Sequence, residues 1–197
     1  MQQIRQLTNR EIQNEIKSLI GRLGALQTES VIQYELIRNP EQSRQNIDYL
    51  LNGLRVSGGA FFSEYNIMPY PNRKIEGDMA IAFWVFTEFA EAAGDRFLAA
   101  NWPSSIIFRT DDAKRPYRIT VCHSPERDEN LAVLANKRWD GVFNEIIAGV
   151  NLREDEIDHT MLPDGDSVIF VSVMSERMLI DIPKMEKTIV KGGDAND

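Results

Sequence analysis

The stretch TESVIQYELIRNPEQSRQNIDYLLNGLRVSGGAFF, residues 28–62, predicts two helices followed by a strand. We expect the first helix to begin after Thr28, a predicted N-cap, and to run to about Arg38. The glycine pair at 58–59 breaks the helical pattern, and residues 60–65 (AFFSEY) then read as a strand. The apolar side of the first helix consists of Val31, Ile32 and Leu36.

The second helix of this stretch combines an apolar stripe with a polar face rich in amides. Asn39 is its predicted N-cap, because Pro40 then occupies the first helical position, where the missing N–H costs nothing. The stripe consists of Ile47, Leu50, Leu51 and Leu54. The opposite face consists of Gln42, Ser43, Arg44, Gln45, Asn46, Tyr49 and Asn52.

Upstream of these two helices, the sequence predicts another helix with defined ends. Thr8 and Glu11 have the spacing of a capping box, and Gly24 is well placed to end the helix. Three helices and a following strand are the element order of a winged helix-turn-helix. We therefore assign residues 1–94 to such a domain and expect its boundary between Gly94 and Pro103.

The remaining sequence predicts a second, α+β domain over residues 95–190, with a disordered tail at 191–197. Residues 78–93 are ambiguous between strand and helix, and we favour a helix that starts at Asp78 and stops at Gly94. The fold class is thus α+β: a winged helix followed by a small mixed sheet with covering helices. Strands are expected at 104–109, 117–122 and 167–173, a helix at 129–139 with a second helical piece at 142–148, and a short apolar element at 178–182.

The charged residues are distributed unevenly along the chain. The net charge is −8, yet residues 1–62 carry seven basic and six acidic groups, whereas the other residues carry 15 basic and 24 acidic groups. The N-terminal part could approach DNA, because DNA affinity comes largely from phosphate neutralisation, and the acidic remainder would be repelled. No window of about eighteen apolar residues predicts a membrane span, and no apolar secretory segment opens the sequence. The single cysteine, Cys122, cannot form a disulfide within the chain. Together, these three features favour a cytoplasmic protein.

The polar face of residues 42–52 predicts a DNA-recognition helix that enters the major groove. Glutamine, asparagine, arginine and serine side chains read base edges or bind phosphates. The alternative is an ordinary amphipathic helix whose polar face is amide-rich, and winged helices also serve in dimerisation and protein docking. The predicted contacts to double-stranded DNA are Gln42, Ser43, Arg44, Gln45, Asn46 and Tyr49, with Arg38 and Arg55 facing the same way.

Catalysis is not expected, and neither is a cofactor or a metal site. Cys122 and His123 are adjacent, so their side chains should point to opposite faces of a strand, which prevents joint activation or metal sharing. The acidic run at 154–158 lacks the alternating ligands and glycine of a calcium loop, so we interpret it as solvated. Asp111 and Asp112 belong most simply to a turn, and a metal bound there or at Glu126 would argue for an enzyme.

Several blocks of the sequence resemble a known family. The blocks LTNREI (7–12), ALQTESVIQ (25–33) and 39–62 resemble the N-terminal winged helix of the replication-relaxation family and its clostridial relatives on mobile elements. The blocks AIAFWVFTEF (80–89), WPSSIIF (102–108), YRITVC (117–122) and 167–183 resemble an uncharacterised family on conjugative elements. Together the resemblance covers residues 4–190 and implies a role in maintaining a mobile element, through DNA or through a partner.

The same resemblance implies that the second domain has a degenerate nuclease-like fold. A working nuclease of that type has an acid on the first hairpin strand and an acid-x-lysine on the next strand. The matching positions here are Ser104 and the stretch Thr120-Val121-Cys122, none of which is an acid or a lysine. The resemblance therefore implies that metal-dependent cleavage is not available to this chain.

Two functions remain in competition. The first is a non-catalytic DNA-binding accessory or regulatory protein of a mobile element, with a homodimer left open because winged helices often bind two half-sites. The second is an acidic protein-binding module that inhibits or docks on a host nucleic-acid-handling protein, including a defence nuclease. An exposed face at Arg44, Gln45, Asn46 and Tyr49 would favour the first, and a contiguous acidic patch on residues 101–197 the second.

Overall fold

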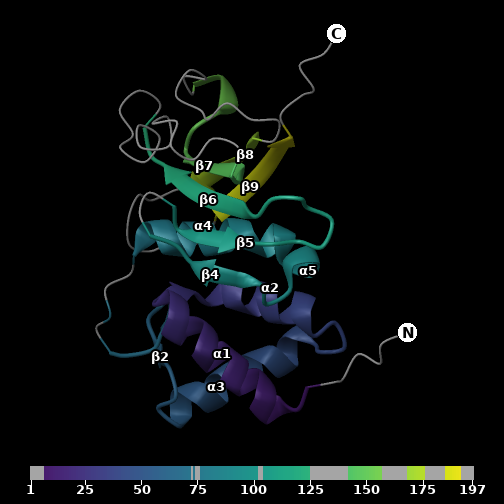
Figure 1. The fold of residues 1–197 in the computed structure, drawn as a ribbon. Helices are drawn as coiled ribbons and strands as arrows, with labels where there is room; N and C mark the ends of the chain where they lie inside the picture. Colours follow the sequence, from purple (N-terminus) through teal and green to yellow (C-terminus); the bar gives the residue numbers. More distant parts are fainter. Residues whose placement is uncertain are drawn as a thin grey trace. The chain divides into compact units, whose positions relative to one another are not determined.

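The structure, a computed structural model, describes residues 7–71, 73, 76–101, 104–124, 142–156, 168–175 and 185–191. Its fold is α+β, as predicted, and the chain divides into two units, residues 1–76 and 77–197 (Figure 1). Each unit has its own sheet. Among the described residues, no helix combines the length and the apolar composition that a membrane span requires.

The first unit is built on three helices, α1 (Asn9–Leu23), α2 (Thr28–Arg38) and α3 (Arg44–Val56). The predicted capping box of α1 is confirmed: the Thr8 N–H donates to the Glu11 carboxylate at 2.8 Å, and the Glu11 N–H donates to the Thr8 hydroxyl at 3.3 Å. Gly24 ends α1 at a φ of 88°, as predicted. The unit's core is drawn from one side of each helix and includes Ile12, Ile16, Leu19, Ile20, Val31, Ile32, Ile47, Leu50 and Leu54.

The predicted starts of α2 and α3 are wrong. Thr28 is the first residue of α2, because the preceding residues 26–27 pair as a strand and lead directly into the helix. Asn39 ends α2 and does not begin α3: its side-chain amide donates to the Glu35 carbonyl at 3.2 Å and to the Glu35 carboxyl at 3.1 Å. The true N-cap of α3 is Ser43, whose hydroxyl accepts the Asn46 N–H.

A small antiparallel sheet completes the first unit. Its strands are β1 (Leu26–Gln27), β2 (Phe61–Phe62) and β3 (Asn66–Met68), in the order β1-β3-β2. Ile67 of β3 lies opposite Leu26 on one side and Phe62 on the other. The predicted strand at 60–65 is thus only two residues long. The sequence analysis did not predict β1 or β3, since two- and three-residue strands carry too short an alternation to show in a sequence.

The second unit contains a mixed six-stranded sheet in the order β4-β5-β6-β7-β8-β9. Strands β6, β7 and β8 are parallel to one another, and the other pairs are antiparallel. The bounds are β4 (Phe97–Ala99), β5 (Ile106–Phe108), β6 (Tyr117–Cys122), β7 (Asn144–Val150), β8 (Val168–Ser175) and β9 (Met185–Lys191).

This sheet confirms some of the predicted elements and corrects others. The strands predicted at 104–109, 117–122 and 167–173 are confirmed as β5, β6 and β8. The helical piece predicted at 142–148 is wrong, because these residues enter β7, which hydrogen-bonds to a parallel strand on each side. Strands β4 and β9 were not predicted, and Lys191 lies in β9 and not in a tail. The elements predicted at 129–139 and 178–182, and residues 192–197, lie outside the described residues.

The ambiguous segment 78–93 is helical, as favoured. It forms α4 (Gly77–Phe86), a 3₁₀ turn (Thr87–Phe89) and α5 (Ala90–Ala93), and it stops at Gly94 with a φ of 64°. Figure 1 shows α4 beside the sheet strands, and the Phe86 ring lies 4.5 Å from Phe97 and 5.3 Å from Phe108 between centroids. The aromatic side of α4 is therefore buried on this sheet. This is why the two units divide after Glu76 and not between Gly94 and Pro103, where the sequence analysis placed the boundary.

A buried ion pair joins the first two parallel strands of the sheet. Arg118 of β6 lies opposite Glu145 of β7, and its Nε donates to both carboxylate oxygens at 2.7 Å. Both side chains are about 95% removed from solvent, at 5% and 4% exposure, and the Phe143 ring lies 4.9 Å from the guanidinium. The two opposite charges compensate each other where solvent is excluded, so loss of Glu145 would leave the Arg118 charge buried without its ion-pair partner.

We expect Glu145→Ala to destabilise the second unit by about 3–5 kcal/mol, because Arg118 would keep its charge without a partner. Urea unfolding followed by tryptophan fluorescence measures this, since all three tryptophans lie beyond residue 76. The double variant Arg118→Met/Glu145→Leu removes both charges and should lose much less stability. Equal losses in the two variants would contradict a cost that arises from the unpaired charge.

The first unit contains a buried ionisable side chain, Glu35, near the end of α2. The Glu35 side chain is fully buried; one carboxyl oxygen accepts from Asn39 and the other has no hydrogen-bond partner among the described residues. Burial, reinforced by the negative charge of Glu15, raises the pKa of Glu35 to about 8, and Arg38 only partly offsets this. Glu35 is therefore protonated in the folded unit at neutral pH.

The free energy of unfolding should fall as pH rises from about 4.5 to about 8, because over this range the folded state holds a proton on Glu35 that the unfolded state has lost. The slope from this group is at most about 1.4 kcal/mol per pH unit. Glu35→Gln keeps a neutral side chain, so it should exceed the wild type in stability at pH 8 and approach it at pH 5. Urea unfolding followed by far-ultraviolet circular dichroism tests this, with Glu41→Gln at an exposed position as the control. A constant difference across this pH range would contradict the titration of Glu35.

Candidate nucleic-acid interface

The packing of α3 determines which of its side chains face solvent. Ile47, Leu50, Leu51 and Leu54 are buried and form the stripe that the sequence predicts. At about 100° per residue, the direction opposite this stripe passes close to Gln45, Tyr49, Asn52 and Val56. The exposed residues of α3 are Arg44, Gln45, Asp48, Tyr49, Asn52, Arg55 and Val56, which we call the outer face of α3.

Three members of the outer face have polar groups available for a ligand. Gln45, Asn52 and Arg55 are exposed, and they have no hydrogen bond or ion pair among the described residues. Tyr49 is 71% exposed and stands one turn from Gln45 on the same side of the helix. Asn52 belongs to the polar face read from the sequence, but it was left out of the predicted contacts.

Three predicted contact residues, Gln42, Ser43 and Asn46, already form hydrogen bonds within the unit. The Ser43 hydroxyl caps α3 by accepting the Asn46 N–H at 3.2 Å, and its substitution would weaken the helix start. The Asn46 amide donates to Asn9 of α1 at 3.3 Å and also to Gln42. Asn46 and Gln42 thus lie half-buried on the side of α3 toward α1, and not on its outer face.

The two outlying arginines differ in their surroundings. Arg55, in the last turn of α3, is exposed and belongs to the outer face. Arg38, the last residue of α2, is half-buried and lies close enough to Glu35 to lower the pKa of that carboxyl slightly. The outer face of α3 therefore contains Arg44, Gln45, Tyr49 and Arg55 of the predicted set, and Arg38 does not belong to it.

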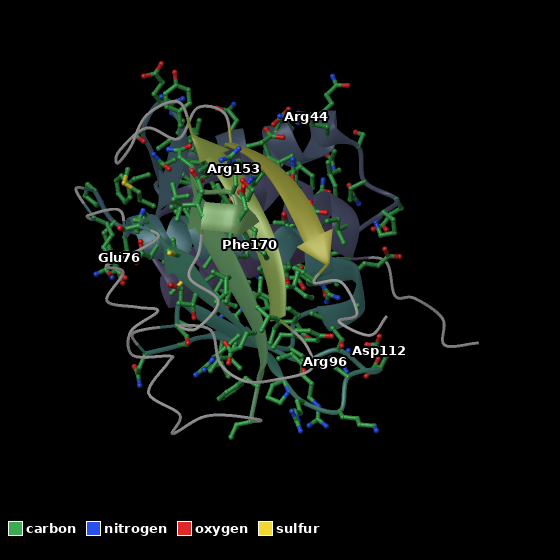
Figure 2. All side chains as sticks on the ribbon, turned by 90° about the horizontal axis from the view of Figure 1, so that it is seen from above. Arg44, Glu76, Arg96, Asp112, Arg153 and Phe170 are labelled. Atoms are coloured by element: carbon green, nitrogen blue, oxygen red, sulfur yellow. The ribbon has the colours of Figure 1, made fainter. Side chains whose placement is uncertain are left out.

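Arg44, labelled in Figure 2, is exposed, yet it is held by an ion pair. Its two terminal nitrogens donate to the two carboxylate oxygens of Glu29 on α2, at 2.8 and 2.5 Å. Asp48 lies 3.9 Å from the Arg44 Nε. The hydrogen bond lowers the pKa of Glu29 and raises that of Arg44, so both groups are charged at neutral pH. The sequence analysis missed Glu29, since nothing in the spacing of residues 29 and 44 links them.

A lysine of α1 also approaches this region. The side chain of Lys17 packs against Gly59. A Cβ added at that glycine would stand 2.7 Å from the lysine Cε. Gly59 follows the C-terminus of α3, and Lys17 therefore places a positive charge near that end of the helix. The hairpin beyond it ends in an acidic tip, where the Tyr65 hydroxyl donates to Glu64 at 2.6 Å.

In the described part of the second unit, Ser104, Thr120, Cys122 and His123 do not form a group of catalytic side chains. Thr120 donates to Ser104 at 3.4 Å, so the two positions matched to the nuclease type are neighbours, and both side chains are buried and neutral. Cys122 is buried, whereas His123 is exposed and pairs with Asp78 at the start of α4, at 2.7 Å. Among the described residues, no group of three or more His, Cys, Asp or Glu side chains could hold a metal ion.

The acidic positions of the second unit are mostly paired or exposed. Asp111 forms an ion pair with Arg96, and Asp112 is exposed in the same turn. Arg153 pairs with Asp155 at 3.4 Å and Glu156 at 3.7 Å. Residues 157–158 of the acidic run and Glu126 lie outside the described residues.

Comparison with known proteins gives no assignment for this interface. None of the family models, curated proteins or solved structures compared with the chain matches it. The resemblance to the replication-relaxation family stays a prediction from the residues alone.

Proposed function

We propose that the first unit is a winged helix-turn-helix module that binds double-stranded DNA with α3 in the major groove. The element order α1-β1-α2-α3-β2-β3 supports this, as does the hairpin β2–β3 that follows α3. Helices α2 and α3 are joined by residues 39–43, a short connection of the kind found in helix-turn-helix proteins. A non-catalytic, regulatory role for the whole chain follows from this proposal.

The observation that carries the proposal is the free polar chemistry on the outer face of α3. Glutamine and asparagine amides pair with adenine through two hydrogen bonds, and arginine pairs with the O6 and N7 atoms of guanine. Gln45, Asn52 and Arg55 present these groups to solvent without partners among the described residues. Tyr49, 71% exposed, adds an apolar ring that could contact a thymine methyl group.

Removing the two free amides should weaken sequence-specific binding while leaving the fold intact. Each good amide–adenine pair is worth about 1–3 kcal/mol of discrimination, so Gln45→Ala/Asn52→Ala should weaken binding at least about tenfold. The measurement is a gel shift across a salt series, with a duplex selected by the wild-type protein from a random pool.

The matched control is Asn14→Ala, which removes an exposed amide from α1. It should bind the selected duplex like the wild type. If the wild type selects no sequence and binds no duplex at low salt, the DNA-binding function is ruled out. If the double variant binds the selected duplex as well as Asn14→Ala does, the assignment of base contacts to Gln45 and Asn52 is wrong.

A second candidate is an acidic protein-binding module in the second unit, docking on a basic nucleic-acid-handling protein. The observation that favours it is a group of exposed carboxylates around α5, at Glu88, Glu91 and Asp95. We expect that wild-type bait would retain such a basic partner and that Glu88→Lys/Glu91→Lys would lose it. A pull-down with both baits, analysed by mass spectrometry, distinguishes the outcomes, and identical retention would exclude this acidic surface.

A further inference from the structure

The ion pair between Arg44 and Glu29 uses the end of the guanidinium that recognises nucleic acids. Arginine binds guanine or phosphate most strongly with two parallel N–H donors. In this structure Nη1 and Nη2 both donate to Glu29, at 2.8 and 2.5 Å, so the end of the group is covered by a carboxylate. On the remaining side, Asp48 lies 3.9 Å from Nε.

This arrangement differs from a carboxylate that merely orients an arginine toward DNA. An orienting carboxylate would contact Nε and one Nη, leaving the other edge of the fork free for the base. Here the contact is made by the two terminal nitrogens, so Arg44 can offer this pair of donors to DNA only if it leaves Glu29. Glu29 and Asp48 together outweigh the single charge of Arg44, and the surface at the amino end of α3 is therefore net negative.

We propose that Glu29 determines the specificity of the outer face of α3 by withholding Arg44 from phosphate groups. The proposal rests on the DNA-binding function proposed above. Sequence-independent affinity comes from phosphate neutralisation, whereas sequence is read by contacts to base edges. Because Glu29 holds Arg44, the sequence-independent affinity for phosphates is weakened. The amides of Gln45 and Asn52, which would read base edges, are unaffected.

The position of the pair supports a role at the interface and argues against a mere contribution to stability. Arg44 and Glu29 are 55% and 42% exposed, and exposed ion pairs contribute little to the stability of a fold. Both lie at helix amino ends, since Arg44 is the first residue of α3 and Glu29 the second of α2. Backbone N–H groups at helix amino ends attract phosphates, so an acid placed here counteracts that attraction.

The test compares Glu29→Gln with Glu41→Gln in the full chain. Both remove one negative charge from the exposed surface near α3, but Glu41 does not contact Arg44. The probes are the duplex selected by the wild type and a scrambled duplex of the same composition. We expect Glu29→Gln to bind the scrambled duplex several-fold more tightly and to steepen the salt dependence, by about 0.9 in log K against log salt for one added phosphate contact. Its affinity for the selected duplex should rise less, so specificity falls.

Glu29→Ala serves as a second variant, since glutamine could still accept one hydrogen bond from Arg44, and circular dichroism confirms the helix content of each variant. Equal effects of Glu29→Gln and Glu41→Gln on the scrambled duplex would overturn the role of Glu29 while leaving the DNA-binding function in place. Weaker binding of both duplexes by both Glu29 variants would also overturn it. Absence of any duplex binding by the wild type and the Glu29 variants would instead overturn the DNA-binding function itself.

Discussion

The burial of one apolar stripe on α3 is the constraint on which the candidate interface depends. Ile47, Leu50, Leu51 and Leu54 are all removed from solvent, so the opposite side of the helix must face outward. Because the stripe has helical spacing, it also sets which amides are displayed and which are consumed. Asn46, a quarter turn from the outer face, meets Asn9 of α1, whereas Gln45 and Asn52 remain open.

In the second unit, the corresponding constraint is the aromatic contact between α4 and the sheet. Phe86 packs on Phe97 and Phe108, and this contact assigns α4 to the second unit. Between two of the parallel strands, Gly149 of β7 leaves room for the ring of Phe170 of β8, which Figure 2 labels; a Cβ at this glycine would stand 2.5 Å from that ring. At Ser104 and Thr120, where a working nuclease would carry charged side chains, this chain has neutral side chains that are buried.

The candidate interface contains a paired arginine and no cluster of basic side chains among the described residues. The even balance of basic and acidic groups in residues 1–62 gives little long-range attraction to DNA. Arg44, the arginine nearest the amino end of α3, is held by Glu29, whereas Arg55 at the other end of the helix has no ion pair among the described residues. A protein with this arrangement would depend on contacts to base edges for its affinity, which agrees with the amide-rich outer face of α3.

The sequence alone determined the features that arise from local patterns. The capping box of α1, the apolar stripe of α3, the helix at 78–93 and strands β5, β6 and β8 all follow from periodicity and from residues that start or stop helices. Contacts between distant residues were decided by tertiary structure. From the sequence, Asn39 could either cap α3 or end α2. In the fold it ends α2, because its amide donates to the carbonyl and the carboxyl of Glu35, and Ser43 caps α3. The apolar run at the start of β7 suits a helix or a strand equally, and the parallel neighbours on both sides made it a strand. The pairing of Arg44 with Glu29 likewise joins residues fifteen positions apart, a separation that carries no periodic signal, so only the packing of α2 against α3 could bring them together.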